Sequence, residues 1–178
     1  YSAQDKAYRV WDMTNYELLF TVPDDDVTEI KISPGIMLLI FNRSTDHKHV
    51  PLKILAIDSG KVLKSFDHPL HAKKKIEFIE QFNEKLLVKQ EGECLQIVDV
   101  RTDVTLEVAS SDFLTPSAFI FLYENQLFLT FRDHNVAVWN FRGELVTKFE
   151  DHLLWNPDCN TNNIYITQQQ DLIISYCK

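Results

Sequence analysis

Histidine and aspartate are the side chains of this sequence that most often bind metal ions, and neither stands in a convincing ligand pattern. His47 and His49 flank Lys48 and could present two imidazoles to a metal, although a loop offers no preorganised geometry and a solvated loop is the alternative. Residues 24–26 are three aspartates, but the glycine and distal glutamate of a calcium-binding loop are missing. We therefore expect no metal ion and interpret both segments as charged loops.

Nucleophilic and cofactor chemistry has no better support in the sequence. The chain contains no GxSxG, no HExxH and no phosphate-binding glycine loop. Cys94, Cys159 and Cys177 are widely spaced and form no CxxC pair, which favours reduced thiols over a disulfide framework. The sequence predicts a chain that is not an enzyme, binds no cofactor and has no small-molecule substrate.

The charge and hydropathy patterns limit the classes of partner that the chain is expected to bind. The 178 residues carry a formal net charge of −8, whereas a nucleic-acid binder usually presents a basic domain or stripe. No apolar run is long enough to cross a membrane, and no signal peptide is visible. We expect protein partners rather than nucleic acid or membrane, and a cytoplasmic or nuclear location. Because the chain starts at Tyr1 within a repeat, we also expect it to be part of a longer protein.

A repeated cassette is the strongest structural signal. Each copy has an alternating apolar strand, an acidic or amide turn, and a second alternating strand; the turns begin at Trp11-Asp12, Ile57-Asp58, Val98-Asp99 and Trp139-Asn140. The second residues of these pairs are 46, 41 and 41 residues apart. A period of about 40–45 residues with four strands per unit is typical of a β-propeller.

The sequence thus predicts an all-β chain, a β-propeller of four-stranded antiparallel blades, as a single segment over residues 1–178. We expect a half blade at 1–22, complete blades at 27–66, 75–110 and 117–149, and a half blade at 163–178. Residues 79–87 also fit a short helix, but a turn at Asn83-Glu84 and the repeat register favour strand–turn–strand. The blades could close as a four-bladed ring, although we favour part of a larger ring.

With these pairs in register, the chain resembles the WD-repeat (transducin β-like) propeller family. In that family a histidine before the first strand of a blade reaches the aspartate of the turn between the second and third strands. Asp67-His68 and Asp151-His152 stand at the matching places, although Val98 replaces the family's tryptophan and leaves the polar network incomplete. The structural repeat positions that the resemblance implies are Trp11, Asp12, Asp58, His68, Asp99, Trp139, Asn140 and His152.

Binding is the expected role, and two segments are the candidates for it. Lys73, Lys74 and Lys75 form a local positive patch that could dock an acidic partner segment, with a solvated loop as the alternative. Leu154 and Trp155 lie in an insert outside the strand cassettes. They either plug the end of the ring or anchor a partner, since tryptophan is enriched at interface hot spots.

The expected function is a non-catalytic scaffold for protein–protein interaction. Val98-Asp99-Val100-Arg101 and Trp139-Asn140-Phe141-Arg142 are similar to the W-D-x-R box of some substrate receptors of cullin-RING ubiquitin ligases. Arg101 and Arg142 would then face an adaptor on the opposite side of the ring; the alternative is two ordinary exposed turn arginines. An enzyme domain with a polar pocket at the ring's channel is the remaining alternative.

Overall fold

The computed structural model describes residues 7–23, 26–133 and 135–149, together with the backbone of residues 163–166 and 172–175. Strands are the regular elements of these residues: β1 (Ala7–Trp11), β2 (Leu18–Pro23), β3 (Val27–Ser33), β4 (Ile36–Phe41), β5 (His49–Ala56), β6 (Val62–Pro69), β7 (Ile76–Phe82), β8 (Lys85–Gln90), β9 (Leu95–Asp99), β10 (Thr105–Val108), β11 (Ala118–Leu122), β12 (Leu127–Arg132), β13 (Asn135–Asn140), β14 (Leu145–Phe149), β15 (Asn163–Ile166) and β16 (Leu172–Ser175). Within this described part, no helix has the length and hydrophobicity that a membrane span requires.

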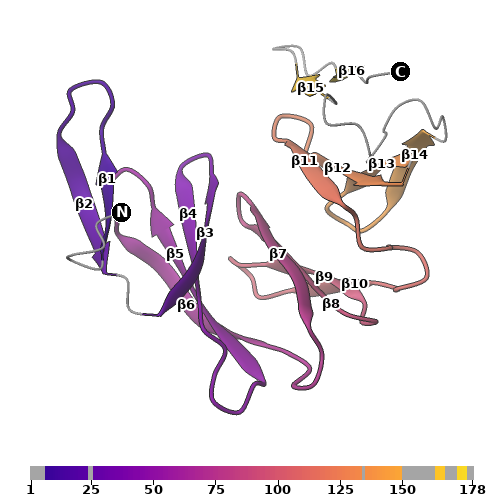
Figure 1. Cartoon of the computed structure of the whole chain (residues 1–178), viewed down its shortest axis with the longest axis horizontal. Coiled ribbons are helices and arrows are strands. Elements are labelled where there is room, and N and C mark those ends of the chain that lie inside the picture. The colour runs from indigo at the N-terminus through magenta and orange to yellow at the C-terminus, as the bar shows by residue number, and fades with distance from the viewer. Residues whose placement is uncertain (1–6, 24–25, 134, 150–162, 167–171, 176–178) are drawn as a thin grey trace.

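Consecutive strands form each sheet. Three four-stranded antiparallel sheets have the orders β3-β4-β5-β6, β7-β8-β9-β10 and β11-β12-β13-β14, and β1-β2 and β15-β16 form two-stranded sheets. The described sheets follow one another in chain order, from indigo β1-β2 to orange β11-β14 (Figure 1). The prediction of an all-β propeller with four-stranded antiparallel blades is confirmed.

The ambiguous stretch around Asn83 is a strand–turn–strand, as the repeat register favoured. β7 ends at Phe82, β8 begins at Lys85, and Asn83 adopts a φ of 47° in the tight turn between them. Asparagine tolerates this left-handed conformation because its short polar side chain can bond to the local backbone. The turn chemistry therefore overrides the helical spacing of the apolar residues.

The core lies between the faces of successive blades. The second and third blades meet in an aromatic cluster, in which the ring of Phe82 is 4.2 Å from that of Phe141 and 4.7 Å from that of Tyr123. Phe82 and Phe128 are fully buried. Burial of each such side chain stabilises the fold by about 1.5–3 kcal/mol, so this cluster is a main contact between the two blades.

The two tryptophans that begin the first and last cassettes differ in environment. Trp139 on β13 is buried, and its Nε1 donates to Thr130 Oγ1 of β12 at 3.0 Å. Trp11 on β1 is 50% exposed in a sheet that has only β2 beside it among the described strands. The ring of Phe113, in the connection before β11, lies 5.2 Å from that of Trp139 and helps to bury it.

β6 differs from the predicted end of its blade. The strand continues to Pro69, three residues beyond Phe66, because Asp67 and His68 pair with Pro51 and Val50 of β5. His68 consequently lies within the outermost strand of its blade rather than in the loop before the next one. Its burial follows from this extension.

Candidate interaction face

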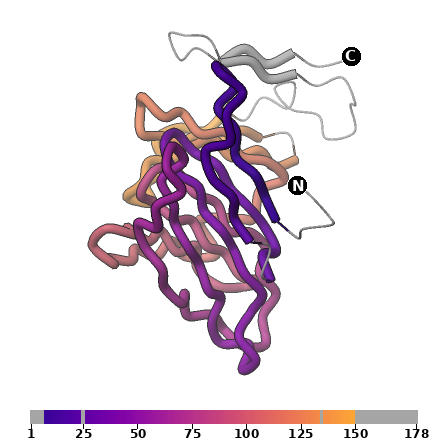
Figure 2. Tube along the Cα trace, turned by 90° about the vertical axis from the view of Figure 1, so that its left-hand side faces the viewer, coloured from indigo at the N-terminus to yellow at the C-terminus, as the bar shows by residue number. Residues whose placement is uncertain are grey.

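The connections of the propeller gather at the two ends of its strands (Figure 2). One end holds the connections after β4, β6 and β8, and we call residues 42–48, 70–75 and 91–94 the loop face. The first two connections touch, since the backbone N–H of Leu70 donates to the carbonyl oxygen of Lys48 at 2.6 Å. The turns after β5, β9 and β13 lie at the opposite end, which we call the turn face.

The side chain of Gln90 fixes the second connection of the loop face, residues 70–75. This side chain is buried at the end of β8; its Nε2 donates to the carbonyl oxygens of His71 and Lys74, both at 3.0 Å. Its Oε1 accepts the backbone N–H of His71 at 2.7 Å. One amide therefore satisfies three backbone groups of residues 71–74 and fixes the conformation of that loop.

Arg43 holds the same loop from the neighbouring connection. Its Nη2 donates to the carbonyl oxygen of Lys74 at 3.0 Å and approaches that of His71 at 3.5 Å. The Nε of this guanidinium is buried without a hydrogen-bond partner among the described residues. Arg43 thus ties the connection after β4 to the connection after β6, and its charge is directed at carbonyl oxygens.

The predicted lysine patch separates into one paired and two unpaired side chains. Lys74 Nζ lies 2.9 Å from Glu93 Oε1, and its hydrogen bond is the main cause that lowers the pKa of that carboxyl. Lys73 and Lys75 are exposed and have no acidic partner in the described part of the chain. The rigid loop therefore presents two free cations to solvent.

A buried lysine supports the third connection. Lys89 is 3% exposed, and its Nζ donates to the carbonyl oxygens of Glu93 at 2.6 Å and Gln90 at 3.2 Å. The Nζ also lies 3.5 Å from Glu77 Oε2, which accepts a hydrogen bond from the hydroxyl of Thr115. Since the ammonium has an ion-pair partner and two carbonyl acceptors, its burial is compensated and it stabilises the turn 91–94.

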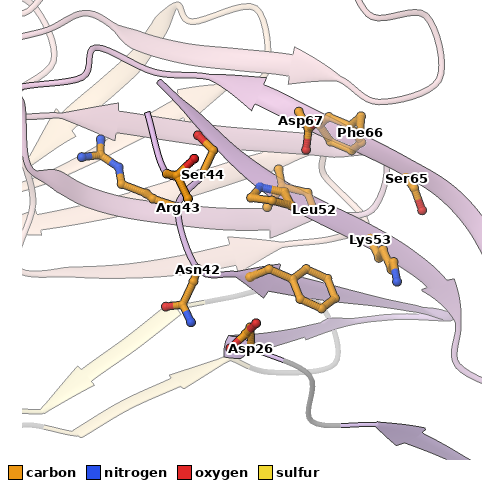
Figure 3. Close-up of a pocket in the computed structure, with 12 residues that line it drawn as sticks. Asp26, Asn42, Arg43, Ser44, Leu52, Lys53, Ser65, Phe66 and Asp67 are labelled. Atoms are coloured by element: carbon orange, nitrogen blue, oxygen red, sulfur yellow. The ribbon is translucent and has the colours of Figure 1, made fainter. Parts of the chain in front are cut away.

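An open groove of about 630 Å³ adjoins the loop face (Figure 3). Arg43 and Ser44 stand at one end of the groove and Lys53 and Ser65 at the other. Its lining is mixed: the residues are Asp26, Phe41, Asn42, Arg43, Ser44, Thr45, Pro51, Leu52, Lys53, Ser65, Phe66 and Asp67. Phe41, Asn42 and Arg43 also line a second groove of about 500 Å³, so these three residues are shared by the two grooves.

In three of the four cassettes, the acidic or amide residue caps a turn of the turn face. Asp99 Oδ1 accepts the backbone N–H groups of Arg101 at 2.9 Å and Thr102 at 3.0 Å, and Asn140 Oδ1 accepts that of Arg142 at 2.9 Å. Lys85 bonds the other oxygen of Asp99 and is the main cause that lowers the pKa of this carboxyl well below its usual range.

The first cassette repeats this arrangement, and the second departs from it. Asp12 Oδ1 accepts the backbone N–H of Thr14 at 2.7 Å. Asp58 accepts the hydroxyl of Ser59 at 2.9 Å but no backbone N–H of the described residues, and its turn contains Gly60 with a φ of 68°. The other three turns also contain a residue with positive φ, namely Tyr16, Asp103 and Gly143, so the second copy differs in its side-chain cap and not in its left-handed residue.

Arg101 and Arg142 are both on the turn face and exposed. Arg101 pairs with Glu84, and Arg142 Nη2 lies 2.9 Å from Glu144 Oε2. The arginine side chains are 72% and 77% exposed, so solvent screens these pairs and they contribute little to stability.

His68 makes a different contact from the one that the family resemblance implies. Its Nε2 lies 2.9 Å from Gln96 Oε1 on β9 of the next blade, instead of reaching the turn at Glu91–Glu93. Burial lowers the pKa of His68, and the hydrogen bond to Gln96 opposes this shift in part. The residue is therefore a neutral link between two blades.

Several predicted positions lie outside the described residues. These are Asp24, Asp25, His152, Leu154 and Trp155, so the choice between plug and anchor for Trp155 stays a prediction. Asp26 is exposed at the edge of the groove, and His49 Nδ1 lies 3.8 Å from Asp46 Oδ2. Among the described residues no three histidine, cysteine or acidic side chains gather as a metal site.

Sequence reasoning missed the residues that fix the loop face, namely Gln90 and Lys89. Both follow the apolar run of β8, so a polar pair at the buried end of a strand was the available signal. Strand alternation assigns one of the two to solvent, whereas both are buried. The sequence does not show which backbone carbonyl oxygens of the loops lie within hydrogen-bond distance of the end of this strand.

Comparison with solved structures supports the propeller. Residues 644–1017 of HIRA match at 14% identity and a TM-score of 0.52, over 84% of this chain and 46% of that one. Hydrazine synthase of Kuenenia stuttgartiensis matches at 11% identity and a TM-score of 0.54, over 97% of this chain and 65% of that one. The computationally designed Ika8 protein matches at 14% identity and a TM-score of 0.50, over 98% and 54%.

These likenesses show the fold alone, and the chain spans between about half and two thirds of the length of the structures it matches. No curated protein matches the sequence. Over residues 1–178 the chain matches the family described as "Domain of unknown function (DUF7899)", and it belongs to that family.

Proposed function

We propose that this chain is a non-catalytic protein-interaction platform and that its partner binds across the loop face. The observation that carries the proposal is the fixation of residues 71–74 by Gln90 and Arg43, beside an open groove. A loop that is rigid before binding loses little conformational entropy when a partner docks. Propellers host many functions, so the site rather than the fold supports this assignment.

The chemistry of the loop face fits a protein better than a small substrate. The groove is open to solvent and mixed in character, with Phe41, Leu52 and Phe66 beside Asp26 and Arg43. A patch that combines a few apolar side chains with a polar rim is typical of protein interfaces. A substrate site would instead enclose most of its ligand.

The turn face supports a second candidate, a substrate receptor of a cullin-RING ubiquitin ligase. The observation in its favour is that Arg101 and Arg142 occupy equivalent turns and are both exposed. An adaptor would have to displace Glu84 and Glu144, and these solvent-screened surface ion pairs oppose that only weakly.

Affinity capture of the full-length protein from cell extract separates the two candidates. The loop-face variants are Ser65→Arg, which fills the groove from an exposed position, and Lys73→Ala with Lys75→Ala. The turn-face variant is Arg101→Ala with Arg142→Ala. Partners lost only with the loop-face variants support the scaffold, and an adaptor lost only with the turn-face variant supports the ligase receptor. Unchanged capture in all variants contradicts both.

A further inference from the structure

We propose that the segment bound by the loop face is a carboxylate-rich stretch of a partner protein, with one apolar side chain that enters the groove. This inference rests on the proposed function and adds the chemistry of the partner. It names Lys48, Lys73 and Lys75 as the side chains that receive the carboxylates. We call these three the lysine triad.

The charge of the loop face opposes that of the chain. Its three connections contain five cations, Arg43, Lys48, Lys73, Lys74 and Lys75, against three carboxylates, Asp46, Glu91 and Glu93, whereas the whole chain has a net charge of −8. The hydrogen bond from Leu70 to Lys48 brings this exposed lysine of the neighbouring connection to residues 70–75. A positive patch on an otherwise acidic protein attracts acidic segments, and the rest of the surface repels them. An acidic segment is therefore directed to this patch.

The triad fits carboxylates better than phosphates. Phosphate recognition commonly uses the planar fork of an arginine, which makes two parallel hydrogen bonds. Arg43 is the arginine of this face, and its Nη2 already donates to the carbonyl oxygens of Lys74 and His71. The ammonium groups of the lysine triad are therefore the cations left for a ligand. They are separate point charges on flexible side chains, and they suit several carboxylates that are spaced along a segment.

The groove sets where the apolar part of the segment lies. Its wall contains Phe41, Leu52 and Phe66, and two acidic residues, Asp26 and Asp67, also line it. Arg43 and Lys53 line the same groove and balance these two carboxylates, so the groove has no net charge and takes an uncharged side chain. Arg43 joins the groove to the loop held by Gln90, which places the apolar anchor next to the acidic residues of the same segment.

Fluorescence anisotropy of the full-length protein with labelled synthetic peptides tests this proposal. The probe has about 12 residues, which span about 40 Å when extended, with a central Leu-Phe pair between runs of glutamate. A second peptide has glutamine in place of every glutamate, and a third has phosphoserine. A fourth keeps the glutamates and has serine in place of the central pair.

The matched variants change two charges at opposite ends of the molecule. Lys73→Gln with Lys75→Gln removes two cations from the loop face, and Lys61→Gln with Arg101→Gln removes two from the turn face. Lys61 precedes β6 and Leu70 follows it, so the eight residues of this strand separate the two sites by about 26 Å. Lys73→Arg with Lys75→Arg keeps the charge and guards against a loss that comes from misfolding.

We expect the glutamate peptide to bind the wild type, the turn-face variant and the arginine variant with the same affinity. It should bind the loop-face glutamine variant at least about tenfold more weakly. The glutamine peptide and the peptide without the apolar pair should also bind at least about tenfold more weakly, and added salt should weaken the glutamate peptide. A phosphoserine peptide that binds about tenfold more tightly than the glutamate peptide overturns the choice of carboxylate.

Equal binding of the glutamate peptide to both glutamine variants, or no binding at all, overturns the proposal. Its failure is distinguishable from that of the proposed function. If the capture experiment still loses partners with the loop-face variants, the platform stands and only the carboxylate chemistry is wrong. If capture is also unchanged, both proposals are wrong.

Discussion

The amide of Gln90 bonds both backbone groups of His71: its Oε1 accepts the N–H at 2.7 Å and its Nε2 donates to the carbonyl oxygen at 3.0 Å. The side chain is buried, so no water can take over these bonds without opening the loop. This pair connects the core of one blade to the loop that presents Lys73 and Lys75. Residues 71–74 of the loop face are therefore tied directly to the end of β8.

Gln90→Leu should loosen the loop face. Leucine has a similar volume but leaves the three backbone groups that Gln90 bonds without partners, and each unsatisfied buried group costs about 1–3 kcal/mol. We expect faster amide hydrogen exchange in residues 70–75 and a lower free energy of unfolding. Gln126→Leu is the control, because Gln126 is exposed and bonds only the carbonyl of Tyr123 in its own turn. Unchanged exchange at His71 in Gln90→Leu would contradict the role of this amide.

Lys89→Met should destabilise the turn at Glu93. The substitution keeps most of the apolar stem but removes the donor to the carbonyl oxygens of Glu93 and Gln90 and the cation beside Glu77. Removing one partner of a buried ion pair typically costs about 3–5 kcal/mol, and we expect less here because Glu77 keeps the hydrogen bond of Thr115. Urea denaturation measures the loss, with Lys61→Met as the control at an exposed turn position. A midpoint equal to that of the wild type would sink this prediction.

His68 should make the fold sensitive to mild acid. Its pKa is lowered from 6.5 in the folded state, chiefly by burial, so the unfolded chain binds the proton more tightly. The stabilisation by neutral His68 is complete above the unfolded pKa and is lost as pH falls below about 6.5. We expect the free energy of unfolding to fall between about pH 7.5 and pH 5.5, by at most about 1.4 kcal/mol per pH unit from this residue.

His68→Gln is the matched variant, since its amide can still bond Gln96 but does not titrate. Urea denaturation at several pH values should give a shallower pH dependence for His68→Gln than for the wild type. The same slope in His68→Gln as in the wild type would show that this histidine is not the titrating group.

Phe82→Ala should weaken the packing between the second and third blades. The ring is fully buried and stacks on Phe141 and Tyr123. Its removal leaves a cavity between the blades, and such truncations cost about 3–5 kcal/mol. Calorimetry should show a large fall in melting temperature, whereas Leu106→Ala at an exposed position should change it little. A loss below about 1 kcal/mol would mean that this cluster does not hold the blades together.

The strands were predictable from the sequence because two local signals agree. Period-two alternation marks the strands, and the acidic or amide residue after Trp11, Val98 and Trp139 marks a turn that the side chain itself caps. The repeat of these signals at a near-constant step also resolved the ambiguous stretch at Asn83. Such signals depend on neighbouring residues, so a single sequence contains them.

The loop face was only partly predictable. The lysine cluster is visible as a run of charge, but its division into paired Lys74 and free Lys73 and Lys75 depends on Glu93, which lies in another connection. Gln90 reaches back 19 residues to His71, a distance set by the packing of blades and not by any local pattern. The extension of β6 through His68 likewise follows from pairing with β5.

The most direct test of the account is site-specific photocrosslinking in the full-length protein inside cells. A photoreactive residue in place of Lys73 probes the loop face. One in place of Lys61 is the control: this lysine is also exposed and lies before the other end of β6, and its replacement removes the same charge. The account predicts a crosslinked partner protein from position 73 and none from position 61. A partner captured only from position 61 would contradict the assignment of the loop face as the interaction surface.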